Sequence, residues 1–281
     1  MPLKIPSISR LVEQKNLASQ LQMEERFFQF WNEKYLSKID YIRTLVTVAS
    51  VSNNLSWIFF SAYQCAIRYH FNLKFNGTIS LAVREISDSR IETTFDNKRN
   101  VLSLSGEKSW IVSTNVDMIL LYVRLNNPIE IYKNNSKCFL RSFLAPINKK
   151  KSALRKKFET RKFLKNLNQG NLILKKTKIA HKNIFSGKNI KGFGHSEQFF
   201  VMLSLGIFFA TKVKSVKYKK IFFKAVKSLI VDFNIRNTPK LTVRLHKQSF
   251  KKMIHIFDNL PERKLIVGWE VDKIIFFNLL R

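Results

Sequence analysis

Residues 81–123 read LAVREISDSRIETTFDNKRNVLSLSGEKSWIVSTNVDMILLYV, and this stretch decides the fold. Short runs of β-branched and apolar residues recur along it, and Ser, Asn, Asp or Gly separate them, residue types that favour turns. Together with the residues just before the stretch, the runs cover 79–83, 91–95, 101–104, 110–113 and 118–123. Short strands at a spacing of roughly 8 to 12 residues predict an antiparallel sandwich or barrel, because βαβ units would need a helix in each gap.

The β pattern continues beyond this stretch. Residues 138–144 and 172–179 have the same composition and predict two further strands. A strongly basic insertion at 148–166 interrupts them, and we interpret it as a loop or an added helix.

Helical periodicity flanks the β region on both sides. Residues 8–70 predict three or four helices, and 55–70 is apolar around nearly the whole circumference, as in a buried helix. Further helices are predicted at 197–227, 242–259 and 265–280, with breakers at Asn-Thr-Pro (237–239) and Asn-Leu-Pro (259–261). The order predicts an α+β chain with an N-terminal helical domain (1–75), a central antiparallel β-sandwich or barrel domain with a basic insertion (76–194) and a C-terminal helical bundle (195–281).

The composition excludes several classes of protein. The 281 residues are 45% hydrophobic and include 25 Phe, too apolar for a disordered chain, and the 8 Gly exclude a collagen-like one. The two cysteines, Cys65 and Cys138, provide neither a disulfide scaffold nor a four-cysteine zinc site, and they favour a reducing compartment. No signal-like segment and no run of about 18 apolar residues is present, so we expect a cytoplasmic protein without a membrane span.

The positive charge is regional. The chain carries 50 Lys or Arg against 19 Asp or Glu, a net charge of +31, and residues 141–229 hold 23 of these cations with two acids, Glu159 and Glu197. The densest part, 149–163, interleaves Lys and Arg with Phe158 and Phe163, a pattern that suits nucleic acid. The alternative is a general bias toward lysine, because Lys outnumbers Arg by 35 to 15 and Arg reads phosphates and bases better.

Three motifs carry a resemblance to a known family. Arg84-Glu85, Ser87-Asp88, the strand 91–95 and the segment SGEKSWIVS (105–113) follow one another as in the middle β-domain of the acyl-CoA dehydrogenases, which this region resembles. Residues 172–193 resemble that family's later strand and turn, with His181 where proline is usual. Residues 268–273, GWEVDK, are similar to the terminal helix of its shorter members.

The resemblance implies an FAD-dependent oxidoreductase. In the family the flavin takes a hydride from Cβ of a CoA thioester while a glutamate takes the Cα proton. It also implies an acyl thioester of CoA or of an acyl carrier protein as substrate, and a homo-oligomer. Both carriers are acidic, and the basic face at 149–191 would attract either of them. The residues that it places beside the flavin are Val83, Arg84, Ser87, Trp110, Val112 and Ser113.

Departures from the family pattern keep two alternatives open. Arg84 and Val112 replace hydroxyl donors of the family, and the motifs for adenine binding and the catalytic base are missing from the shorter C-terminal region. Glu262 and Glu270 are the late acids, and we interpret both as solvated helix residues. The alternatives are a catalytically degenerate member that acts as a structural or oligomer partner, and a basic nucleic-acid-binding protein.

Other chemistries find no support in the sequence. His181, His195, His246 and His255 have no ligand partners at metal-site spacing. GKNIKGFG (187–194) lacks the order of a phosphate-binding loop, and no GxSxG nucleophile motif occurs.

Overall fold

The computed structural model describes residues 3, 21, 23–83, 92–96, 101–113, 115–124, 137–143, 154–158, 162–180, 184–185, 190 and 192–280. The chain divides into two compact units. A helical unit comprises Met1–Asn76, Lys162–Asn166 and Lys191–Arg281, and a β unit comprises Gly77–Arg161 and Leu167–Ile190. The N-terminal and C-terminal helices, which the sequence analysis assigned to separate domains, thus share one unit.

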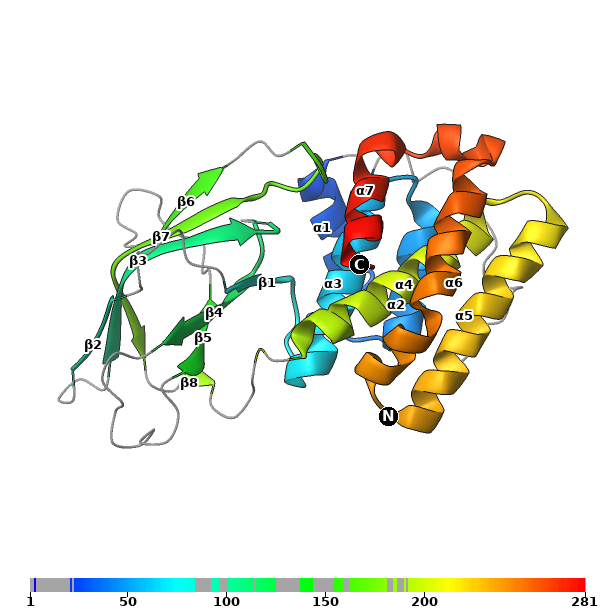
Figure 1. Cartoon of the computed structure of the whole chain (residues 1–281). Helices are drawn as coiled ribbons and strands as arrows, with labels where there is room; N and C mark the ends of the chain where they lie inside the picture. The colour runs from blue at the N-terminus through cyan, green and yellow to red at the C-terminus, as the bar shows by residue number, and fades with distance from the viewer. Residues whose placement is uncertain are drawn as a thin grey trace. The chain divides into compact units, whose positions relative to one another are not determined.

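The first three helices of the helical unit are α1 (Glu24–Glu33), α2 (Tyr41–Val51) and α3 (Leu55–Phe71) (Figure 1). The Asp40 carboxylate caps α2 by accepting the Arg43 N–H at 2.9 Å, and Asn54 caps α3 through the Ser56 N–H at 2.9 Å. Nearly every side chain of α3 is buried, which confirms the prediction of a buried helix in this segment.

Helix α4 (Phe193–Lys212) lies at the centre of the helical unit, in contact with α2, α3, α5 (Val216–Arg236) and α6 (Pro239–Asp258). Its composition explains this place, because α4 is apolar on all sides and would lose stability in water. Stacked rings join it to its neighbours, with centroids 4.5 Å apart for Phe199 and Phe233 and 4.3 Å apart for Phe209 and Phe257.

The prediction of one helix over 197–227 is wrong. Helix α4 ends at Lys212 and α5 begins at Val216. In the break, the Lys214 N–H donates to the Glu262 carboxylate at 2.9 Å, so a distant residue satisfies a backbone donor that the helix would have used. The predicted breakers before α6 and after it are confirmed, and the chain continues through the 3₁₀ helix η5 (Pro261–Leu265) and α7 (Trp269–Leu279).

The β unit contains two four-stranded sheets. One has the order β1 (Ile79–Ala82), β4 (Met118–Arg124), β5 (Lys137–Phe143), β8 (Ile184–Phe185), and the other has the order β2 (Glu92–Asp96), β3 (Val101–Ile111), β7 (Gly170–Ala180), β6 (Leu154–Phe158). The pairs are antiparallel except β1 with β4, which are parallel and are connected in the chain through β2 and β3 of the other sheet. The predicted α+β class with a mainly antiparallel centre is confirmed.

Two predictions within the β unit are wrong. Strand β3 runs through Ser105-Gly106, where we expected a turn; the pairing with β7 shifts register there, and Gly106 has φ 139°. A bulge therefore takes the place of the turn. The basic insertion contains strand β6, paired with β7, where we expected a loop or a helix. Its lysines suit an edge strand, since charged side chains block pairing with other chains.

Candidate functional site

Strand β1 crosses the end of β3, and two side chains fasten this crossing. The Ser80 hydroxyl donates to the Ser113 carbonyl at 2.8 Å and accepts the Ser113 N–H at 3.3 Å. Both serines are fully buried. We call residues 80–83 and 108–113 together the β1–β3 crossing.

Lys108 makes the second link. Its side chain is 0% exposed, and its ammonium Nζ donates to the Val83 carbonyl at 3.1 Å. A buried ammonium lowers stability unless polar atoms surround it, so the position of the Val83 carbonyl is tied to that of this cation. The bond therefore places a formal positive charge next to Val83, the residue that follows the end of β1.

The start of β1 is held as firmly as its end. Thr78 donates its N–H and its hydroxyl to the Asp117 carboxylate at 2.7 and 3.0 Å, and its carbonyl accepts the Met118 N–H at 3.0 Å. Since both ends of β1 are bonded, the crossing offers the rigid support that a ligand-binding surface needs.

Four of the six predicted flavin residues belong to the crossing, and the side chains of three of them are described. Val83 is one end of the Lys108 link, Ser113 is one end of the Ser80 link, and Val112 beside it is 4% exposed. The backbone N–H and carbonyl of Ser113 are both bonded to Ser80. The Ser113 hydroxyl accepts the Asn115 N–H at 3.2 Å, and its own hydrogen remains available as a donor.

The other three are only partly described. Trp110 belongs to β3, between Lys108 and Ser113 in the chain, and its side chain lies outside the described residues. Arg84 and Ser87 lie outside the described residues altogether. The sequence analysis did not single out Lys108, because a lysine within a strand ordinarily faces water.

Glu197 is the carboxylate whose chemistry stands out in the helical unit. It lies near the start of α4, is partly buried, and burial raises its pKa to about 7. A carboxylate with that pKa can accept a proton near neutral pH and still release it. The sequence analysis counted Glu197 only as an acid within a basic region; its place as the one acid of an otherwise apolar helix was the available signal.

The two late acids, Glu262 and Glu270, differ in their exposure to solvent. Glu270 is 66% exposed and pairs with Arg263 at 3.1 Å and Lys273 at 2.7 Å, which confirms a solvated helix residue. The same interpretation is wrong for Glu262, which is 8% exposed in the 3₁₀ helix η5 and accepts the Lys214 N–H. It was missed because its partner lies 48 residues away.

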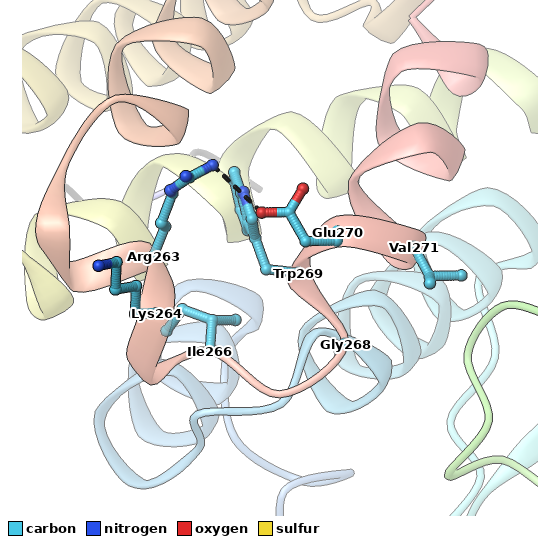
Figure 2. A pocket seen from close by; sticks show the side chains of 7 residues that line it. All are labelled: Arg263, Lys264, Ile266, Gly268, Trp269, Glu270 and Val271. Atoms are coloured by element: carbon cyan, nitrogen blue, oxygen red, sulfur yellow. Dashed lines mark hydrogen bonds and ion pairs between the residues drawn. The ribbon is translucent and has the colours of Figure 1, made fainter.

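A shallow cavity of about 410 Å³ lies in the helical unit before α7 (Figure 2). Its charged side chains bind one another: Arg263 bridges Glu270 and Asp258, and Asp258 also accepts the Trp269 indole N–H at 2.7 Å. Although partial burial acts to raise it, hydrogen bonds from Trp269, Lys273 and Arg263 hold the pKa of Asp258 below its ordinary value. This network accounts for the carboxylates around the cavity, so we find no proton acceptor there. The lining residues are Arg263, Lys264, Ile266, Gly268, Trp269, Glu270 and Val271.

Among the described residues, no group of three or more His, Cys, Asp or Glu has the arrangement of a metal site. Burial raises the pKa of the Cys65 thiol to about 12, so this cysteine is unreactive at neutral pH. No helix among the described residues has the length and apolarity for crossing a membrane.

Comparison with solved structures identifies the fold. Along 100% of its length the chain is similar to butyryl-CoA dehydrogenase from Megasphaera elsdenii, with a TM-score of 0.60, 9% identity and 98% of that chain covered. It is similar to the prolyl acyl carrier protein oxidase AnaB, with a TM-score of 0.57, 12% identity and 97% and 96% of the two chains covered. FMN-bound TdsC from Paenibacillus sp. A11-2 gives a TM-score of 0.61 at 8% identity, over 92% of this chain and 84% of that one.

Sequence comparison alone finds none of this. No family model matches the chain, and no curated protein matches it. The structural neighbours nevertheless confirm the fold that the motifs at 81–123 and 172–193 predicted, the fold of the acyl-CoA dehydrogenases.

Proposed function

We propose that this chain is a flavoprotein that oxidises an acyl thioester at Cα–Cβ with FAD as the hydride acceptor. The observation that carries the proposal is the β1–β3 crossing, where Val83, Val112 and Ser113 follow the ends of β1 and β3 and hydrogen bonds join the two strands. The fold, which the chain shares with flavin-binding dehydrogenases, gives the crossing its context.

The residues at the crossing fit a flavin. An isoalloxazine ring needs an apolar support that is held in place; Val83 is half-buried, and the buried Lys108, Val112 and Ser113 fix the segments on which the ring would rest. FAD, when bound, would supply hydride acceptance. We assign its binding to Val83, Arg84, Ser87, Trp110, Val112 and Ser113, and we add Lys108, whose charge favours an electron-rich ring.

The substrate is proposed by class only: an acyl chain on CoA or on an acyl carrier protein. Solved neighbours carry both kinds in their names, a butyryl-CoA dehydrogenase and a prolyl acyl carrier protein oxidase. We also propose a homo-oligomer in the cytoplasm, and a light-scattering mass near 33 kDa would contradict the oligomer.

Anaerobic flavin bleaching tests the reaction. The protein loaded with FAD is mixed with butyryl-CoA and, separately, with a butyryl carrier protein, and the visible flavin band is followed. Bleaching by either thioester supports the proposal. A flavin that stays bound and oxidised with both substrates would point to the degenerate member of the fold instead.

A further inference from the structure

Helices α5 and α6 hold the excess positive charge of the helical unit. They carry eleven Lys or Arg against two Asp, while α1, α2 and α3 together carry three basic and three acidic residues. Helices α4 and α7 add one basic residue each, against one and two acids. A general bias toward lysine would spread over all these helices, so it does not explain the concentration on two of them.

The two carboxylates of these helices have other partners. Asp232 bonds to His246 across the two helices at 2.6 Å, and Asp258 bonds to Arg263, Lys273 and Trp269. In these contacts, neither carboxylate pairs with a lysine of α5 or α6. The charge therefore projects into solvent and attracts anions over about a Debye length, roughly 8–10 Å at physiological salt.

Exposed aliphatic side chains accompany the charge. Ile221, Val231 and Ile235 follow one another along α5 at spacings that leave them on one side of the helix, and they are 37%, 38% and 73% exposed. On α6, Leu241 and Leu245 are one turn apart and 45% and 56% exposed. The helices run side by side (Figure 1), joined by the Asp232–His246 bond.

We infer that this surface, which we call the α5–α6 face, is the docking site of an acidic acyl carrier protein. The inference rests on the proposed function, because it takes the carrier-bound thioester as the substrate. Carboxylates of the carrier would pair with Lys220, Lys224 and Lys252, which are all exposed, and its apolar residues would cover the aliphatic side chains. A helix of 21 residues spans about 30 Å, enough for one side of a standard protein interface.

The other occupants fit less well. A second copy of the chain would bring a like charge of nine against nine on these two helices, which opposes association. Single-stranded nucleic acid binds by stacking bases on aromatic rings, but the large exposed hydrophobic residues on the described α5 and α6 are aliphatic.

The test measures binding of a fluorescently labelled acyl carrier protein to the full chain by anisotropy, across a salt series. The triple change Lys220→Gln, Lys224→Gln and Lys252→Gln should weaken binding about tenfold at low salt and flatten its salt dependence. The matched control removes three exposed lysines elsewhere in the helical unit, Lys34→Gln, Lys74→Gln and Lys264→Gln, and should change the affinity less than about threefold. The double change Ile235→Ser and Leu245→Ser should also weaken binding, at every salt concentration.

Three results would overturn the inference. One is no carrier binding, or equal losses in the face and control variants. Another is tight binding of an oligothymidylate that depends on the three lysines but not on Ile235 and Leu245, which would assign the face to nucleic acid. The third is self-association that Ile235→Ser and Leu245→Ser abolish. Because the assay needs neither flavin nor turnover, carrier binding by a protein that fails to hold FAD would refute the proposed function and leave the docking face standing.

Discussion

The β unit and the helical unit use lysine in opposite ways. In the β unit, Lys108 is fully buried and its ammonium bonds to one defined backbone carbonyl, that of Val83. In the helical unit, the lysines of α5 and α6 project from the surface, and no carboxylate in either helix accepts from them in the bonds described above. A buried lysine fixes the position of the atom that it bonds to, whereas an exposed row of lysines creates a long-range positive potential.

The largest effect we predict concerns the packing around α4. A Cβ added at Gly206 would lie 2.5 Å from Val226 Cγ2 and 3.2 Å from a Phe250 ring atom, so Gly206→Ala should cost about 1–3 kcal/mol of unfolding free energy. At Gly194, in the first turn of the same helix, nothing lies within 4 Å, and Gly194→Ala should be neutral or stabilising by up to about 1 kcal/mol. Denaturant titration measures the pair, and equal stabilities would mean that α4 is not packed as tightly as described.

The buried lysine of the β unit gives the second largest effect. Lys108→Met removes the Val83 link, and the affinity for FAD should fall about tenfold, equivalent to about 1.4 kcal/mol. Lys178→Met changes an exposed lysine on β7 and should leave the affinity unchanged. Fluorescence titration gives both dissociation constants. If the two variants bind FAD alike, the contrast between a positioning lysine and a surface lysine fails.

The smallest predicted effect is a pH dependence of stability. Burial raises the pKa of Glu197 to about 7 from 4.5, so the folded state holds this proton more tightly than the unfolded chain does. Its ionisation therefore costs stability as the pH rises from about 4.5 to about 7, and the cost is complete above that. At pH 8, Glu197→Gln should increase the free energy of unfolding by roughly 1–2 kcal/mol and so raise the melting temperature. Near pH 4 the change should leave the melting temperature unchanged. An equal shift at both pH values would contradict the assigned pKa.

The elements that could be predicted from the sequence are those in which burial gives a periodic pattern of apolar residues. The strands of the segment 81–123 and the all-round apolar helix α3 were recognisable because burial leaves a pattern in neighbouring residues. Strand β6 was missed because its lysines suit an edge strand but resemble a loop. The break between α4 and α5 was missed because its cause, Glu262, lies far along the chain.

The candidate site was predictable only through resemblance. Motif order pointed to Val83, Val112 and Ser113, but Lys108 could not be found this way. Its importance comes from burial and from the Val83 carbonyl, 25 residues away in sequence. Long-range contacts of this kind leave no local signal in a single sequence.

The absorption spectrum of the protein tests the central claim most directly. The chain is incubated with FAD, freed of unbound ligand, and compared with Trp110→Ala and with Tyr35→Ala, which removes an exposed aromatic ring of the helical unit. We predict a retained flavin band in the unchanged protein and in Tyr35→Ala, and a weaker band in Trp110→Ala. A folded protein that retains no flavin would contradict the assignment of the β1–β3 crossing as a flavin site.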